Sequence, residues 1–133
     1  MRYRNHQGRR LLHLLSAPVI WAVIIPLIFL DLFAELYHHI CFPVYGLKRV
    51  RRADYIRIDR QRLSYLRFFD KVNCMYCGYA NGFLAYASEI AARTEAYWCG
   101  IKHQQGGGFH APKHHDAFIR YGDERAFRRR YDR

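Results

Sequence analysis

The stretch from Leu11 to Leu30, LLHLLSAPVIWAVIIPLIFL, contains no Asp, Glu, Lys or Arg. A helix of about 20 apolar residues covers the roughly 30 Å of hydrocarbon in a bilayer. The chain has 133 residues, so the residues left for a soluble core are few. The sequence therefore predicts a membrane-attached protein with a small extramembrane part.

The residues around this stretch favour an uncleaved anchor, which we place at 11–42. Four arginines of the basic tail, residues 1–10, precede it, as in a signal peptide: Arg2, Arg4, Arg9 and Arg10. No small-x-small cleavage site follows, and the helical pattern continues through DLFAELYHHI. Two topologies remain open. The anchor is a single span, or a re-entrant or interfacial hairpin bent at Pro18 and Pro26.

The distribution of positive charge predicts the orientation. Of the 22 Lys and Arg residues, 18 follow the apolar stretch, which favours a C-terminal part in the cytoplasm, beneath the inner membrane. Close to the membrane the two sides are nearly balanced, because five basic residues follow the anchor: Lys48, Arg49, Arg51, Arg52 and Arg57. In a reducing compartment the cysteines remain thiols.

These five basic residues form the expected lipid-contacting surface. Positive side chains beside a membrane anchor meet anionic headgroups, and each contributes about 1 kcal/mol near the surface. Tyrosines and phenylalanines interleave with the basic residues, a pattern that also suits nucleic acid, and a partner protein is a third reading. We expect anionic lipid as the partner, possible association with a membrane protein complex, and no nucleic acid.

A second pattern predicts a metal site. Cys74 and Cys77 are spaced C-x2-C, and Cys99 and His103 are spaced C-x3-H. Three thiolates and one imidazole complete the tetrahedral shell of a structural Zn²⁺, and mononuclear iron is the alternative cofactor. A metal would also stabilise a core-poor domain. The fourth cysteine, Cys41, is expected to be a small buried hydrophobe.

The residues around the cysteines resemble known metal knuckles. CMYCGY at 74–79 is similar to the first knuckle of rubredoxins and zinc ribbons, and YWCGIKH at 97–103 resembles a degenerate second knuckle. His103 stands where a rubredoxin has cysteine, which favours zinc over electron transfer. Over its whole length the chain is similar to small bacterial membrane proteins with a CxxCGYxNG and YWCxIKH signature. That resemblance implies a membrane location and no activity.

A further candidate site lies at the end of the anchor. Asp31, Glu35 and His38 fall on one helix face, with His39 alongside, and Glu35-x-x-His38 has the spacing of di-iron bundle proteins. Glu89 and Glu95, or Asp31, would complete such a site. The alternatives are a solvated or salt-bridged helix end here and, for Glu89, an ordinary ion pair with Arg93.

The expected fold is mainly α. After the anchor we expect a basic helical metal-binding domain over 43–104, with a helix at about 60–72, a knuckle, and a helix at about 83–98 ended by Cys99-Gly100. On that last helix the residues expected to face inward are Leu84, Ala87, Ile90 or Ala91, and Thr94. Residues 105–133 are expected to form a Gly-, His- and Arg-rich tail that is extended or partly ordered on the surface.

Three functions remain open at this stage. The first is a membrane-anchored zinc-binding module that acts as an interaction or assembly factor and is not an enzyme. The second is an iron-binding redox or metal-handling protein. The third is a membrane di-metal oxygenase that uses Glu35 and His38.

Overall fold

The computed structural model describes residues 7–132, which include no β-strand; 69% of the structure is helical. This confirms a mainly α fold that begins with an apolar helix. The four α-helices are α1 (Arg10–Ala22), α2 (Ile24–Val44), α3 (Phe68–Trp98) and α4 (Glu124–Tyr131). Short 3-10 turns lie at Gln7–Arg9, Arg52–Asp54, Arg60–Arg62 and Lys113–Ala117. Arg2 and Arg4 of the predicted basic tail lie outside the described residues.

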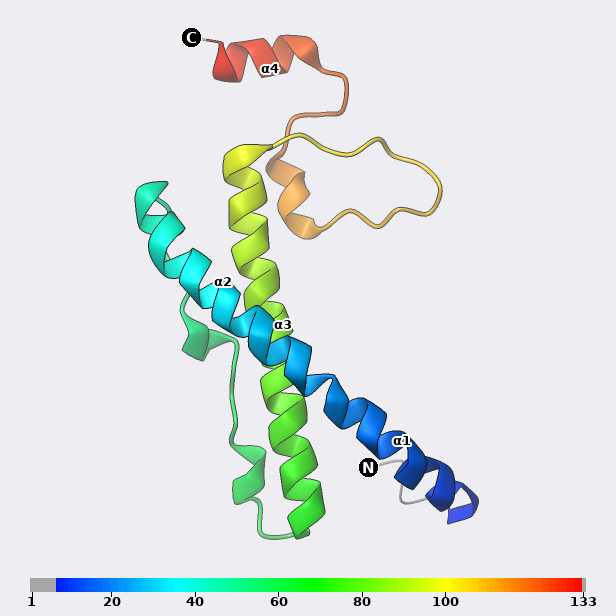
Figure 1. Ribbon diagram of the computed structural model, residues 1–133. Helices are drawn as coiled ribbons and strands as arrows, with labels where there is room; N and C mark the ends of the chain where they lie inside the picture. The colour runs from blue at the N-terminus through cyan, green and yellow to red at the C-terminus, as the bar shows by residue number, and fades with distance from the viewer. Residues whose placement is uncertain (1–6, 133) are drawn as a thin grey trace. The chain divides into compact units, whose positions relative to one another are not determined.

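The anchor forms two helices that continue in nearly the same direction, with an interruption at Val23 (Figure 1). Pro26 has no N–H to donate to the carbonyl of Ala22, which accounts for the interruption at this point. Pro18 lies inside α1 without ending it. The anchor is therefore not bent into a hairpin.

Together these helices, Arg10–Val44, form one element of 35 residues that is long and apolar enough to cross a membrane. Only 6% of its most apolar stretch is buried within the protein. The core helix of a soluble protein would be mostly buried, so this helix does not serve as one.

The chain divides into two compact units, residues 1–87 and 88–133. The boundary lies inside α3, which contributes residues to both units. This differs from the division expected from the sequence, in which residues 43–104 form one domain. The predicted domain was bounded by composition, whereas the observed units are defined by the side chains that pack together.

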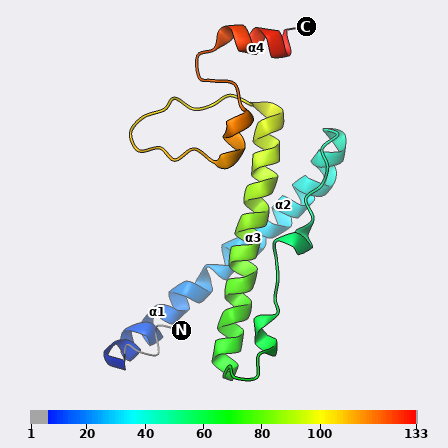
Figure 2. The ribbon, with the colours of Figure 1, turned by 180° about the vertical axis from the view of Figure 1, so that it is seen from behind.

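In the first unit an extended segment follows α2 and runs back alongside α3 (Figures 1 and 2). Two glycines of α3 allow this approach. A Cβ on Gly82 would lie 2.8 Å from the carbonyl oxygen of Tyr55 and 2.9 Å from the Cα of Ile56. A Cβ on Gly78 would lie 3.0 Å from the carbonyl oxygen of Arg57. Gly78 and Gly82 are thus packing positions inside a helix.

The predicted helix at 60–72 was wrong. Only Arg60–Arg62 forms a short 3-10 turn there, and α3 begins at Phe68. Phe69 is 78% exposed and Leu63 is exposed as well, so the apolar side chains of this segment do not form a helical core face.

The core of the first unit joins α2 to α3. Its most completely buried side chains are Phe42 and His38 from α2 and Phe83 and Tyr86 from α3. Leu84, predicted to face inward, is half-exposed. Phe83 and Tyr86 take the inner positions here instead, whereas Ile90, in the second unit, is buried as expected.

The second unit begins with the last turns of α3. Cys99-Gly100 ends that helix as predicted: Gly100 has φ +63°, and the N–H groups of both residues donate to the carbonyl of Glu95. Ile101 then pairs with Ile119 in an isolated parallel bridge. Phe118 and Ile119 are buried, so the tail is partly ordered and includes packed structure within residues 105–132.

Candidate functional site

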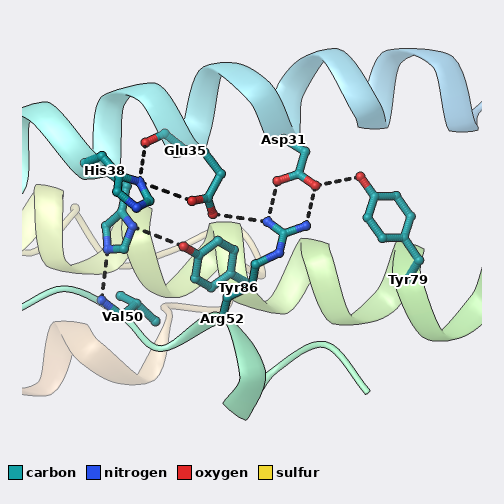
Figure 3. A network of polar contacts seen from close by, with 8 residues as sticks. Asp31, Glu35, His38, Val50, Arg52, Tyr79 and Tyr86 are labelled. Atoms are coloured by element: carbon teal, nitrogen blue, oxygen red, sulfur yellow. Dashed lines mark hydrogen bonds and ion pairs between the residues drawn. The ribbon is translucent and has the colours of Figure 1, made fainter. Parts of the chain in front are cut away.

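One polar network in the first unit gathers the acidic face of α2 (Figure 3). Arg52 donates from Nη1 and Nη2 to the two carboxylate oxygens of Asp31, each at 2.6 Å, and from Nη1 to Glu35 at 3.1 Å. Tyr79 of α3 donates its hydroxyl to Asp31 at 2.7 Å. The fork of the guanidinium matches both oxygens of one carboxylate, so this pair fixes the extended segment on α2.

His38 is the buried end of the same network. Its Nε2 accepts the backbone N–H of Val50 at 2.9 Å, which requires an unprotonated Nε2. A neutral ring then carries its hydrogen on Nδ1, which lies 3.1 Å from the Tyr86 hydroxyl and donates to it. Because His38 is only 2% exposed, both ring nitrogens have protein partners and neither is open to water.

The network alters the acidity of its outer members. Hydrogen bonding to Asp31 raises the pKa of Arg52 above its usual range, so this cation remains charged. Burial, and then the bond to Asp31, raises the pKa of Tyr79 to about 12. Burial, and then a hydrogen bond to Glu35, also raises the pKa of Tyr86. All three groups therefore keep their protons at neutral pH.

The five predicted lipid-contacting residues divide into two groups. Arg52 is held by Asp31 and Glu35 within the network, so its guanidinium already has partners inside the protein. Lys48, Arg49, Arg51 and Arg57 are exposed. The sequence could not separate them because the partner of Arg52 lies 21 residues away.

The predicted metal set of Cys74, Cys77, Cys99 and His103 is not brought together. Cys74 and Cys77 lie within α3, and the helix continues through every residue between Cys77 and Cys99. A continuous helix advances about 1.5 Å per residue and cannot double back, so no knuckle forms. Two groups of side chains within residues 7–132 could hold a metal ion, and neither of these groups includes a cysteine. Cys77 and Cys99 are exposed, while Cys41, expected to be buried, and Cys74 are partly exposed.

One of those groups combines Glu95, His103 and His115, whose ligand atoms all lie within 4.8 Å of one another. Glu95 comes from the last turn of α3, and His115 from the 3-10 turn Lys113–Ala117. His114 Nε2 lies 2.7 Å from Glu95 Oε2, and His115 Nε2 lies 3.1 Å from both carboxylate oxygens. The hydrogen bond from His114, followed by that from His115, lowers the pKa of Glu95.

His115 is the buried member of this group, at 3% exposure. Within residues 7–132, its Nδ1 has no hydrogen-bond partner. A buried polar atom left unsatisfied costs about 1–3 kcal/mol. The ring of His115 stacks on Phe118 and lies beside His103, with centroids 5.6 Å apart. His103 and His115 also line a cavity of about 340 Å³ together with the Gly106–Gly108 loop.

The other group is Glu35, His38 and His39. Its side chains already have protein partners: His38 through both nitrogens, Glu35 through Arg52, and His39 through the carboxylate and carbonyl oxygens of Glu35. A metal there would have to displace these bonds and share the carboxylate with a guanidinium. The geometry is that of a helix-end ion-pair network. Glu89, once considered for this site, pairs with Arg93 at 2.8 Å as the simpler interpretation predicted.

The chain matches no protein-family model, no curated protein and no solved structure. The local resemblance to rubredoxin and zinc-ribbon knuckles does not extend to the backbone, because residues 74–79 are helical. The chemistry of the two clusters therefore follows from their own residues.

Sequence reasoning found one side of each cluster and missed the other. It identified Asp31, Glu35 and His38 but not Tyr79 and Tyr86, which contact them from α3. A signal was present: Tyr79 and Tyr86 are seven residues apart and share a helix face, as Asp31 and His38 do. In the second unit His103 was identified, but with cysteines in place of Glu95 and His115.

Proposed function

We propose that this protein is a membrane-anchored module that works as an interaction or assembly factor at the cytoplasmic surface of the inner membrane. The observation that carries the proposal is the exposed apolar helix Arg10–Val44. An apolar helix of this length needs a non-aqueous environment, and its own chain covers little of it. Lipid is the environment that suits its side chains.

The outer face of α2 supports an extended lipid contact. Its inner face becomes polar at Asp31, but large apolar side chains remain exposed along the other side to the end of the helix: Ile25, Phe29, Leu32, Phe33, Leu36, Ile40 and Val44. We name this row the outer stripe. Its spacing of three and four residues places it on one side of the helix.

The length of the helix determines how the stripe meets the membrane. Thirty-five residues cover about 50 Å, more than the roughly 30 Å of bilayer hydrocarbon. The charge-free part, Leu11 to Leu30, would fill that thickness if the helix stood upright. Residues 31–44 are amphipathic, with the network on one side and the stripe on the other. The nearly straight helix therefore has to tilt for the stripe to stay in contact with lipid.

Fractionation of cells that express the full chain tests the anchor. We expect the protein to stay with membranes through an alkaline carbonate wash, because an inserted helix is held by apolar burial and not by charge. Recovery of the folded protein in the soluble fraction would remove the proposal.

A fluorescence experiment tests the outer stripe. In a background carrying Trp21→Phe and Trp98→Phe, a tryptophan at Leu36 should be quenched by lipids brominated along the acyl chain. The matched control is a tryptophan at Ala85, an exposed position of α3, which should not be quenched. Equal quenching at both positions, or none at Leu36, would contradict the contact of the stripe with lipid.

A further inference from the structure

The second unit contains a cluster that the membrane anchor does not explain. We infer that Glu95, His103 and His115 bind one divalent zinc ion. This site shares only His103 with the set expected from sequence, and it uses no cysteine. It depends on contacts within residues 88–133 and not on the location of the protein in the cell.

The donor atoms have the composition of a known kind of site. Two imidazoles and one carboxylate are the protein ligands of several zinc enzymes, which leave the fourth position to water. The three ligand atoms lie within 4.8 Å of one another. Ligands around a tetrahedral zinc are about 3.4 Å apart, given bonds of about 2.0–2.1 Å. The cluster therefore has to contract by about 1 Å or a little more.

The segment that carries His103 allows this contraction. His103 is exposed and follows the end of α3, with Gly106, Gly107 and Gly108 immediately beyond it. Glu95 and His115 are already in contact, 3.1 Å apart. Binding therefore requires His103 to move toward two ligands that the fold has already placed.

Burial fixes which nitrogen of His115 faces the cluster. His115 is 97% buried, and its Nε2 is the nitrogen that contacts Glu95. Nε2 is therefore the ligand atom of this site. When a metal binds there, the hydrogen of the neutral ring moves to Nδ1, which has no hydrogen-bond partner within residues 7–132.

The neighbouring groups suit a bound cation. The Glu95 carboxylate supplies one negative charge, and His114 donates to it at 2.7 Å, which fixes its orientation. Asp116 and Lys102 line the adjoining cavity, and their opposite formal charges add no net charge to it. In contrast to Glu35, Glu95 has no arginine among its contacts in the described chain.

Metal titration of the full chain in detergent micelles, after treatment with a chelator, tests the site. Cobalt is the first probe, because its visible spectrum reports the coordination geometry and thiolate ligands add a strong near-ultraviolet band. We expect one equivalent of Co²⁺ to bind without the thiolate band and Zn²⁺ to displace it. A thiolate band would instead support the cysteine set and overturn the inference.

Three variants identify the ligands. His103→Ala should weaken Zn²⁺ binding at least tenfold, and because His103 is exposed the fold should survive its removal. His110→Ala, an exposed histidine of the same loop, is the matched control and should bind like the parent. The double variant Cys74→Ser, Cys77→Ser should also bind like the parent.

The outcomes separate the alternatives. Unchanged affinity in His103→Ala, with an unaltered circular dichroism spectrum, would overturn the site. Loss of binding in the cysteine variant would restore the set expected from sequence. If the purified protein contains iron and the His103→Ala variant does not, the ligand set stands and the bound metal is iron, which overturns the assignment to zinc. A protein that binds Zn²⁺ through His103 but is not membrane-bound would contradict the anchor alone.

Discussion

Arg52 and Asp31 form a two-point ion pair, with both guanidinium Nη atoms 2.6 Å from the carboxylate oxygens. The pair links an extended segment to the apolar anchor helix across 21 positions of sequence. Arg52→Ala should lower the free energy of unfolding by about 2 kcal/mol, between the values for surface and buried pairs, because the Arg52 side chain is 38% exposed. Chemical denaturation in micelles measures this.

The control for that variant is Arg51→Ala. Arg51 is 80% exposed and lies 4.0 Å from Asp54, so its loss should change the stability by less than about 0.5 kcal/mol. Equal effects of the two substitutions would show that Arg52 contributes only as a surface charge.

Gly82 should not tolerate a side chain. The added Cβ of Gly82→Ala would lie 2.8 Å and 2.9 Å from the backbone atoms of Tyr55 and Ile56, which cannot rotate away. We expect a loss of about 1–3 kcal/mol despite the better helix propensity of alanine. Asn81→Ala, at an exposed neighbouring position, is the control. Thermal unfolding measures the two stabilities. Equal midpoint temperatures for Gly82→Ala and Asn81→Ala would show that the backbone of Tyr55 and Ile56 does not lie close to Gly82.

Tyr86→Phe should destabilise the first unit. The hydroxyl of Tyr86 is the partner of His38 Nδ1, and both side chains are almost fully buried. Its removal leaves a buried N–H without an acceptor, at a cost of about 1–3 kcal/mol. Tyr65→Phe, at a position 76% exposed, should have little effect. A parent-like midpoint for Tyr86→Phe would mean that His38 does not depend on this bond.

Tyr79 predicts an alkaline dependence of stability. Its pKa is raised to about 12 in the folded protein, so the stabilisation is complete below the unfolded value of about 10 and is lost as pH rises toward 12. The stability difference between the parent and Tyr79→Phe should narrow over that interval. Denaturation of both proteins across the range measures it, and a constant difference would contradict the raised pKa.

The exposed arginines after the anchor should control binding to anionic vesicles. In a chain that lacks residues 1–42, and with them the apolar anchor, salt should release the protein from anionic vesicles, because exposed charges are screened within about 10 Å at 0.1 M. Replacement of Arg49, Arg51 and Arg57 by glutamine should lower the salt concentration at which this release occurs. Neutral vesicles are the control and should show no difference. Binding that is indifferent to both salt and substitution would remove lipid as the partner of these residues.

The sequence by itself determined the features that depend on neighbours along the chain. The charge-free stretch predicted the apolar helix, Cys99-Gly100 predicted where α3 ends, and Glu89 and Arg93 predicted their own ion pair. The face shared by Asp31, Glu35 and His38 was also evident from spacing alone. Each of these follows from helix geometry within a few residues.

Only the tertiary structure decided the contacts between distant residues. Cys74-x-x-Cys77-Gly78 has the local pattern of a knuckle, yet the packing of residues 55–58 on Gly78 and Gly82 accommodates this segment within one helix. The cysteines are then not gathered, and Glu95 meets His114 and His115 across about 20 positions instead. Side-chain partners of this kind depend on which surfaces pack together, and that is a property of the whole fold and not of any short stretch of residues.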